Sequence, residues 1–292
     1  MKKNDLKAYF RLTRPHHHLK NVLIGLPLFF SGKLFDGDAV RCGALGFLAF
    51  CALSSAVYIF NDLRDVQSDR AHPVKSRRPL ASGAVSPAAA RWLAGLLLAL
   101  AAGLHLLAVG WSGWGWLPPL LYLALNIGYS CGLKRVPIVD IAILVSGFLL
   151  RVLYGGAVVG APVSNWLYLT VTSLAFYLGL GKRRNELRRD GEKNRAVLKH
   201  YTAAFLDKNM YMFLPLAIAF YALWCVDPAT VALHRTDALV WTVPLVILIC
   251  MRYSLDVERA DYGDPVELVL RDRVLLGMLA AYAAVALVVV YR

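Results

Sequence analysis

The sequence has 292 residues, of which 58% are hydrophobic and only 17% charged, and its formal net charge is +13. The apolar residues come in long runs and not in one-sided stripes, which excludes an ordinary soluble protein and indicates an integral membrane protein. Because the basic residues lie in short segments between these runs, nucleic acid is excluded as the partner, and anionic lipid heads and phosphorylated substrates are favoured. The five cysteines show no metal-binding spacing, so we expect neither disulfides nor zinc.

The chain is predicted to start with a short amphipathic helix over 4–13 that lies on the membrane surface and stops before Arg14-Pro15. The polar start lacks the pattern of a removed signal peptide. Nine apolar runs follow, each close to the ~20 residues that a bilayer requires. Because only helices satisfy the backbone of such runs in lipid, the predicted fold is an all-α, multi-pass bundle of nine transmembrane helices. The runs are 19–35, 39–60, 87–109, 113–130, 138–160, 165–181, 209–226, 238–255 and 272–291.

The lysines and arginines predict the orientation of these spans. Most of the 32 basic residues fall in the alternate segments 1–20, 62–91, 134–135, 182–208 and 252–273. Basic residues gather on the cytoplasmic side of membrane proteins. The amino terminus and the long charged segments are therefore expected in the cytoplasm, and the carboxyl terminus outside.

An acidic and then basic stretch, 61–83, interrupts two apolar runs. If the helix before it continues, Asn61, Asp65 and Asp69 recur every four residues and share one face, with Asp62 one position away. Like charges so arranged repel each other, and oxygen-only ligands favour Mg²⁺. From spacing alone, a solvated face next to the membrane explains the stretch equally well.

The order of residues in this stretch resembles the first aspartate-rich motif of the UbiA superfamily of intramembrane prenyltransferases. The motif reads Asn61-Asp62-x-x-Asp65-x-x-x-Asp69-Arg70, then His72-Pro73-x-Lys75 and Arg78-Pro79-x-Ala81-Ser82-Gly83. Further motifs, spread from Arg14 to Arg273, resemble the phosphoribosyltransferase branch of this superfamily. They are Arg14-Pro15, Lys20-Asn21, Tyr129-Ser130-x-x-Leu133-Lys134, Gly147-Phe148-x-x-Arg151, Gly181-Lys182-Arg183-x-x-Glu186-Leu187, Asp264-Pro265-x-Glu267 and Arg271-Asp272-Arg273.

The resemblance implies one integral-membrane domain over 1–292, with a polar cavity that opens to the cytoplasm and to lipid. Its cytoplasmic motif loops would be 61–86, 130–137, 182–208 and 252–271. It further implies that Asn61, Asp62, Asp65 and Asp69 bind Mg²⁺ and that the three aspartates are catalytic. The implied substrate-binding residues are Lys20, Asn21, Arg70, Lys75, Arg77, Arg78, Tyr129, Lys134, Arg151, Lys182, Arg183 and Glu186.

The segment 181–201 departs from the superfamily. Most UbiA-like enzymes carry a second aspartate-rich motif here, whereas this chain has only Glu186, Asp190 and Glu192 among many basic residues. The resemblance implies transfer of phosphoribose from 5-phosphoribosyl 1-diphosphate to a polyprenyl, decaprenyl-like phosphate, and three anionic groups suit a basic segment. The alternatives are a polyprenyl diphosphate:aromatic prenyltransferase and a transporter or lipid-binding protein without catalysis. The isoprenoid length stays open, as does a homo-oligomer.

Several of these basic residues also have a structural explanation. Arg151 lies inside a predicted span, where a charge costs about 2.5–3.5 kcal/mol, so it should face a polar cavity or pair with an acid such as Asp140. Lys134 sits where topology anchors are common. The same anchoring role would explain Lys75, Arg77 and Arg78.

Overall fold

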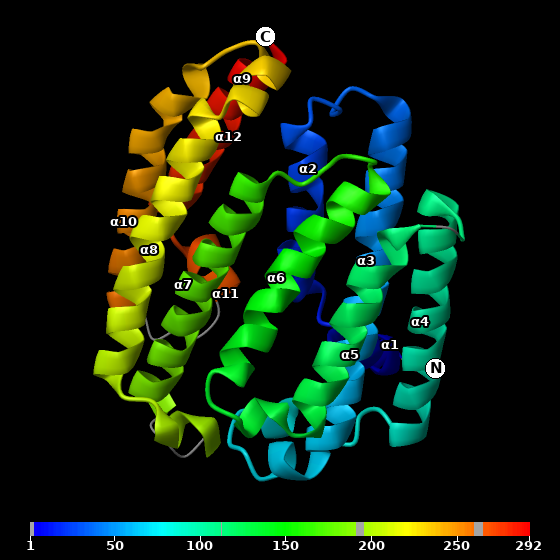
Figure 1. Cartoon of the computed structure of the whole chain (residues 1–292). Helices are drawn as coiled ribbons and strands as arrows, with labels where there is room; N and C mark the ends of the chain where they lie inside the picture. The colour runs from blue at the N-terminus through cyan, green and yellow to red at the C-terminus, as the bar shows by residue number, and fades with distance from the viewer. Residues whose placement is uncertain (1–2, 112, 191–195, 260–264) are drawn as a thin grey trace. The chain divides into compact units, whose positions relative to one another are not determined.

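A computed structural model describes residues 3–111, 113–190, 196–259 and 265–292 (Figure 1). This part of the chain is helical and contains no strand, which confirms the all-α prediction. The α-helices are α1 Lys3–Leu12, α2 Gly25–Phe30, α3 Gly37–Arg70, α4 Pro87–Val109, α5 Leu117–Cys131, α6 Val139–Val158, α7 Asn165–Asp190, α8 Ala203–Val226, α9 Pro228–His234, α10 Val243–Arg259, α11 Pro265–Arg271 and α12 Arg273–Tyr291. The 3-10 helices are η1 Pro15–Ile24, η2 Lys75–Arg77, η3 Trp114–Trp116, η4 Leu133–Arg135, η6 Ala196–His200 and η7 Ala238–Thr242.

Within the described ranges, six segments are long and apolar enough to cross a membrane, so the protein is a multi-pass membrane protein. They are Gly37–Arg70, Pro87–Val109, Val139–Val158, Ala203–Val226, Ala238–Glu258 and Arg273–Tyr291. The predicted count of nine is not confirmed. The run 19–35 forms a 3-10 helix followed by the six-residue α2, α5 has 15 residues, and the run 165–181 continues into the charged end of α7.

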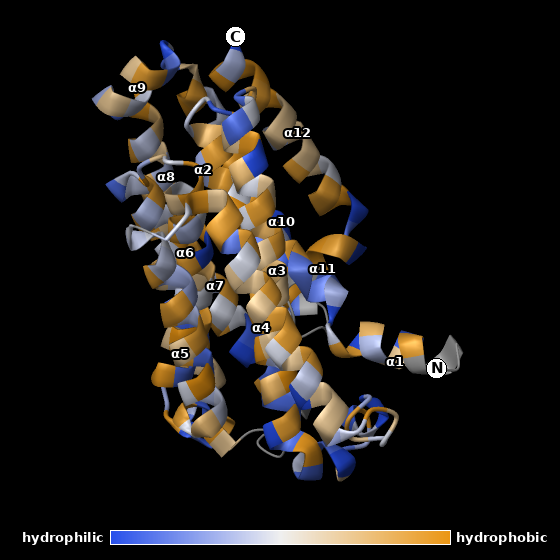
Figure 2. Cartoon of the chain, turned by 90° about the vertical axis from the view of Figure 1, so that its right-hand side faces the viewer, coloured by the Kyte–Doolittle hydropathy of each residue, from blue (hydrophilic) through white to orange (hydrophobic). Residues whose placement is uncertain are grey.

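The six helices differ in how much of their apolar surface the protein covers. In α3 and α6, 61% of the most apolar stretch is buried, whereas the corresponding share is 11% in α4 and 17% in α12. Figure 2 shows hydrophobic residues along α4, α10 and α12. An apolar surface of this size exposed to water would be unfavourable, so α4 and α12 face lipid, whereas the apolar stretches of α3 and α6 are mostly covered by protein.

The charged ends of three helices correct the prediction of cytoplasmic loops. α3 runs on to Arg70, α7 to Asp190 and α10 to Arg259, so the segments predicted as loops from 61, 182 and 252 all begin as helix. α3 starts at the capping carboxylate of Asp36 and stops just before Pro73, which cannot continue a helix. The first aspartate-rich motif therefore lies on a rigid helix.

The chain forms two compact units, which we describe separately. The first unit is Met1–Leu28, Leu34–Lys134 and Leu150–Ala161, and the second is Phe29–Lys33, Arg135–Leu149 and Pro162–Arg292. In the first unit α3 packs along α4 and α5. In the second, α7 packs along α8, and α10 packs against α8 and α12. Helix α6 belongs to both units: its residues up to Leu149 lie in the second unit, and those from Leu150 on lie in the first.

In the first unit, α6 approaches η1 so closely that only glycine fits. A Cβ atom on Gly155 would lie 2.2 Å from the carbonyl oxygen of Ile24. Such contact is far below van der Waals distance, so a larger residue would force the two elements apart. One turn before each of these residues lie Arg151 and Asn21, whose side chains are thereby brought within hydrogen-bonding distance.

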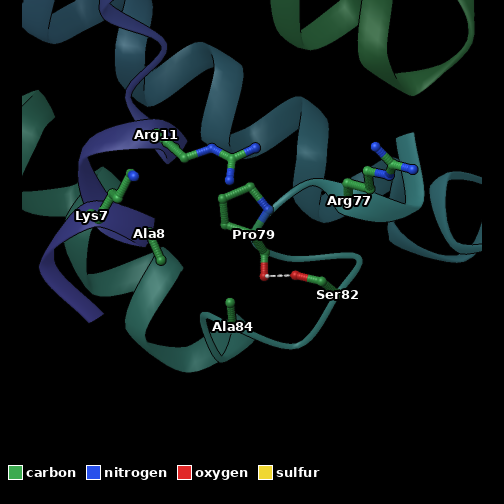
Figure 3. Close-up of a pocket in the computed structure, with 7 residues that line it drawn as sticks. All are labelled: Lys7, Ala8, Arg11, Arg77, Pro79, Ser82 and Ala84. Carbon is green, nitrogen blue, oxygen red and sulfur yellow. Dashed lines mark hydrogen bonds between the residues drawn. The ribbon is translucent and has the colours of Figure 1, made fainter. Parts of the chain in front are cut away.

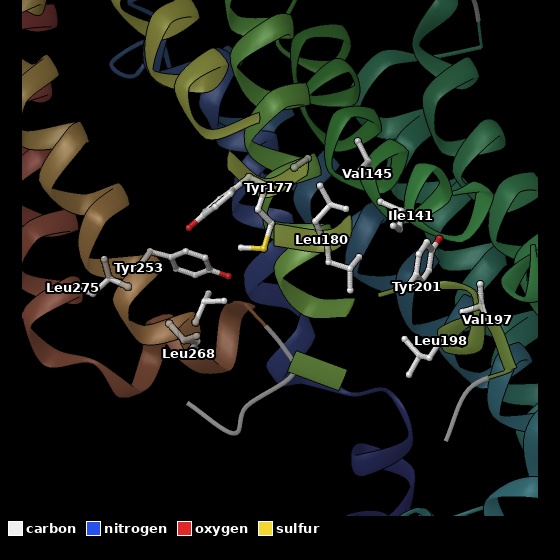
Figure 4. Close-up of a cluster of buried hydrophobic side chains, with 14 residues drawn as sticks. Ile141, Val145, Tyr177, Leu180, Val197, Leu198, Tyr201, Tyr253, Leu268 and Leu275 are labelled. Atoms are coloured by element: carbon white, nitrogen blue, oxygen red, sulfur yellow. The ribbon is translucent and has the colours of Figure 1, made fainter. Parts of the chain in front are cut away.

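The core of the second unit contains a buried ion pair. The same unit holds a cluster of buried apolar residues from α6, α7, η6, α8, α10, α11 and α12 (Figure 4). Arg183, which is 0% exposed, donates from Nε to Asp140 Oδ2 at 2.6 Å and from Nη1 to Glu186 Oε2 at 2.7 Å. Tyr201 donates its hydroxyl proton to the other oxygen of Asp140 at 2.6 Å. Both carboxylate oxygens of Asp140 are thus satisfied, as burial requires.

The same tyrosine stabilises a strained backbone position. Ile138, a β-branched residue just before α6, has φ 69, a conformation that costs such residues roughly 1–3 kcal/mol. Its N–H donates to the hydroxyl oxygen of Tyr201 at 2.6 Å. Burial, and after it the hydrogen bond to Asp140, raises the pKa of Tyr201, so the phenol keeps the proton that it donates.

We predict that Arg183→Ala destabilises the protein strongly. The substitution leaves the Asp140 carboxylate buried without its cation, which costs about 3–5 kcal/mol when one partner of a buried pair is removed. Thermal unfolding in detergent should show a clearly lower Tm. Lys199→Ala, which removes an exposed cation from η6 of the same unit, is the matched control and should change little. Equal Tm values for the two variants would contradict the structural role of Arg183.

Candidate active site

Two buried aspartates near the end of α3 share one arginine. Asp62 accepts from Nη2 of Arg14 at 2.5 Å and from Nη1 of Arg78 at 3.2 Å. The same Nη1 of Arg78 donates to Asp69 at 2.7 Å. The side chains of Asp62 and Asp69 are only 3% and 6% exposed. They are seven positions apart, which is about two helical turns, so both face the loop that carries Arg78.

The third aspartate faces a different element. Asp65 accepts from Nζ of Lys134 at 2.6 Å, and Asn61, one turn earlier, accepts through its side-chain oxygen from the hydroxyl of Ser130 at 3.0 Å. Ser130 lies in the last turn of α5, and Lys134 follows in η4. The predicted single ladder is therefore divided into two neighbouring stripes, one facing η1 and the loop after α3, the other facing the end of α5.

Electrostatics explains why this many cations gather here. The carboxyl end of a helix carries a partial negative charge, so aspartates in the last turns of α3 are repelled by the helix and by one another. Burial would make Asp62 and Asp69 costly without partners. Arg14, Arg78 and Lys134 offset this repulsion from three directions.

The donor chemistry of this cluster fits a divalent cation. Carboxylate and amide oxygens are the ligands that Mg²⁺ prefers. In the observed side-chain conformations protein cations hold the carboxylates, and among the described residues no group of three or more His, Cys, Asp or Glu side chains is arranged to hold a metal. A metal would therefore have to exchange with Arg78 or Lys134.

The other predicted basic residues of the motif 61–83 lie at the end of α3 and in the segment that follows it. Arg70 is exposed and donates from Nε to the backbone oxygen of Ala81 at 3.2 Å, which ties α3 to the following loop. Lys75 lies half-exposed on η2. Arg77 is exposed and lines a separate pocket. Of the two neighbouring arginines, Arg78 contacts the aspartates.

Arg151 is buried between aromatic rings in the first unit. Its guanidinium carbon lies 5.0 Å from the ring centre of Phe50 and 4.9 Å from that of Tyr122. Nε donates to Asn21 Oδ1 at 2.7 Å, and Nη2 donates to the Tyr122 hydroxyl at 3.3 Å. The expected alternative partner, Asp140, is instead bound to Arg183. Cation–π contact and hydrogen bonds offset the cost of burying this charge.

Two further predicted residues lie beside these groups. Lys20 precedes Asn21 on η1 and is half-buried, and Tyr129 precedes Ser130 on α5 and is half-buried. Both are thus next to a residue of the network in the first unit. Their direct contacts to a substrate stay a prediction.

In the second unit, the predicted donor-binding residues are largely internal. Arg183 and Glu186 belong to the buried network of Asp140, so neither presents a free charge in this conformation. Lys182 beside them is half-buried, and Arg184 pairs with Asp207. Glu192 and Asp264, which the sequence analysis singled out, lie outside the described residues, as does the side chain of Asp190.

Several residues of these networks were not predicted as site residues, among them Arg14, Ser130 and Tyr201. Arg14 and Ser130 occur in the motifs that carry the family resemblance, so the sequence did contain a reason to include them among the site residues. Tyr201 had no such signal, because an isolated tyrosine after a charged segment has no distinctive pattern. Its partner Asp140 was considered only for Arg151.

Comparison with curated proteins finds relatives over nearly the whole chain. The chain is 35% identical over 298 residues to decaprenyl-phosphate phosphoribosyltransferase of Corynebacterium glutamicum, covering 99% of this chain and 88% of the relative. It is 34% identical to the protein of the same name from Mycolicibacterium smegmatis, covering 94% and 89%.

Solved structures and a family comparison agree on the fold. A UbiA homolog from Archaeoglobus fulgidus bound to GPP and Mg²⁺ superimposes with a TM-score of 0.68 at 21% identity, covering 97% of this chain and 98% of that one. The sequence model of the UbiA prenyltransferase family matches residues 23–271, which include the cation-bound aspartates of α3. The chain belongs to the UbiA prenyltransferase family.

Proposed function

We propose that this protein transfers 5-phosphoribose from 5-phosphoribosyl 1-diphosphate to a polyprenyl, decaprenyl-like phosphate and releases diphosphate. The observation that carries the proposal is the cluster of Asp62, Asp65 and Asp69 with its three cations, in a chain similar over almost its full length to decaprenyl-phosphate phosphoribosyltransferases. Such a cluster of aspartates and cations suits a metal-bound substrate that carries several phosphates.

The charge balance supports a phosphoribosyl donor over an aromatic acceptor. The donor carries a diphosphate and a separate phosphate, and the acceptor carries a third anionic group. Lysines and arginines bind phosphate oxygens well, and the segment where relatives of the aromatic type keep a second acidic motif is basic in this chain. In that segment we assign donor contact to Lys182, which is half-buried, whereas Arg183 is fully buried against Asp140.

The reaction requires that the two substrates be aligned and that the charge of the leaving diphosphate be stabilised. It does not require a strong general base. An oxygen of the acceptor phosphate forms a bond to ribose C1 while the bond from C1 to the diphosphate oxygen breaks, with inversion at that carbon. The phosphate is already an anion at neutral pH, so no strong base has to remove a proton. The protein must hold the two substrates in line and stabilise the leaving diphosphate.

The aspartates and their cations would divide this task. A Mg²⁺ ion bound by Asn61, Asp62, Asp65 and Asp69 would neutralise charge on the departing diphosphate. Arg78 and Lys134, which the carboxylates now hold, would turn to the phosphate oxygens once that pairing is exchanged. Arg151 is fully engaged by Asn21 and the rings of Phe50 and Tyr122, so we give it the role of holding η1 against α6.

We further propose that the chain crosses the bacterial inner membrane nine times and forms one domain, with the motif segments in the cytoplasm. The crossings beyond the six long helices would be made by η1 with α2, by α5 and by the first part of α7. The bias of basic residues supports this orientation.

The transferase proposal predicts that membranes containing the protein incorporate labelled phosphoribose into lipid. We would incubate them with Mg²⁺, labelled 5-phosphoribosyl 1-diphosphate and polyprenyl phosphate, and measure label in the organic phase. Lys182→Ala should retain the reaction with a higher KM for the donor. Turnover of 4-hydroxybenzoate with a polyprenyl diphosphate, and none of the sugar donor, would establish the aromatic alternative. Absence of both reactions would favour a non-catalytic lipid-binding protein.

The metal proposal predicts that Asp65→Asn and Asp69→Asn lower kcat by orders of magnitude while the protein stays folded in detergent. Each substitution removes a negative ligand and keeps the shape of the side chain. Chelation of divalent ions should abolish activity of the wild type, and added Mg²⁺ should restore it. Arg64→Ala, which removes an exposed charge from the same helix, is the control and should retain activity. Near-normal turnover in both aspartate variants would refute the assignment.

The topology proposal predicts opposite labelling of two single cysteines in an otherwise cysteine-free protein. Lys75→Cys, on the cytoplasmic side, should stay protected from a membrane-impermeant thiol reagent applied to the periplasmic side. Arg235→Cys, exposed after α9, should react. Labelling of position 75 from the periplasmic side would overturn the proposed orientation.

A further inference from the structure

A second basic site lies beside the first helix of the chain, in the first unit. α1 and the segment 77–84 border an open pocket of about 190 Å³. The lining residues are Lys7, Ala8, Arg11, Arg77, Pro79, Ser82 and Ala84. Arg11 projects over Pro79 with Lys7 beside it, and Arg77 lies on the other side of Pro79 (Figure 3). One water needs roughly 10–15 Å³ of such space, so the pocket has room for a tetrahedral phosphate group.

The three cations of this pocket have no acidic partner in the described part of the chain. Lys7, Arg11 and Arg77 form no ion pair there, and none of the lining residues is acidic. The neighbouring arginines Arg14 and Arg78 differ, because both are bound to Asp62. Arg14 and Arg78 thus neutralise Asp62, whereas the cations around the pocket have no acidic partner among the side chains that the structure describes.

The sequence of α1 places these cations at the edge of an apolar surface. Leu6 and Phe10, one turn apart, are each 63% exposed. Lys7 and Arg11 follow them by one residue and form the adjacent stripe. The opposite side of the helix is fixed, because Leu12 is fully buried in a core with Ile59 and Leu80. An exposed apolar stripe next to a basic one is typical of a helix that lies in the membrane interface.

We propose that the pocket binds a phosphate group, and that its source is the headgroup of an anionic membrane lipid. The cations supply charge-assisted hydrogen bonds, and the hydroxyl of Ser82, which now donates to the carbonyl oxygen of Pro79, adds a donor within the same pocket. The exposed Leu6 and Phe10 bring the pocket to the depth at which lipid phosphates lie. The site is separate from the aspartate cluster, so the inference does not depend on the proposed transferase activity.

The test compares lipid binding of full-length protein in uncharged detergent. Phosphatidylglycerol should raise the Tm of the wild type, and Lys7→Ala with Arg11→Ala should raise the apparent Kd for this lipid at least about tenfold. Arg64→Ala with Arg91→Ala removes the same charge from exposed positions of the same unit and is the matched control. The variant Lys7→Gln with Arg11→Gln, which keeps long polar side chains, is the second test and should show the same loss.

The outcomes separate the sources of phosphate. An equal loss of lipid binding in the control variant, or none in the two pocket variants, would overturn the site. A Tm increase with millimolar inorganic phosphate, lost in the pocket variants and not matched by phosphatidylglycerol, would overturn the lipid and assign the pocket to a soluble phosphate. A phosphatidylglycerol response that phosphate does not reproduce, and that phosphatidylcholine does not produce, would support the proposal as stated.

Discussion

The ion pairs between Arg78 and the aspartates Asp62 and Asp69 are the interaction on which the first unit depends. They join the end of α3 to the loop that follows it, and Arg14 joins the same carboxylate of Asp62 to the segment before η1. These contacts place three separated parts of the chain around one buried charge cluster. Since the carboxylates repel one another, the cluster is stable only while cations surround it. A metal ion that arrived with a diphosphate would supply positive charge in place of the protein cations.

The second unit also contains a buried cluster of opposite charges, and there the arginine is fully buried. Arg183 lies between Asp140 and Glu186, is fully buried, and has Tyr201 as an additional support through Asp140. A buried, hydrogen-bonded network of this kind gives rigidity to the helices that it joins. The contrast explains why two motifs that look alike as charged sequences have different roles, one at the candidate active site and one in a helix core.

The sequence predicted which acidic residues α3 carries, but it did not predict which residues they contact. Spacing and resemblance together identified Asn61, Asp62, Asp65 and Asp69, and the helix that carries them does continue to Arg70. The single face was an idealisation, because the contacts of Asp62 and Asp65 depend on which neighbouring element supplies a cation, and helical periodicity does not contain that information. The number of spans could not be predicted for a similar reason. The hydrophobicity of a run indicates that it lies in lipid, but it does not indicate whether the run forms one continuous helix.

By itself the sequence determined that this protein is an all-helical membrane protein of the UbiA prenyltransferase family, because hydrophobic length, basic bias and local motifs are properties of contiguous residues. Only the tertiary structure decided which charges are free. Arg77 and Arg78 are neighbours in the chain, yet one lines an open basic pocket and the other binds two aspartates. The reason is physical: a charge acquires its role from the groups that surround it in space, and those groups are brought together by packing between distant segments.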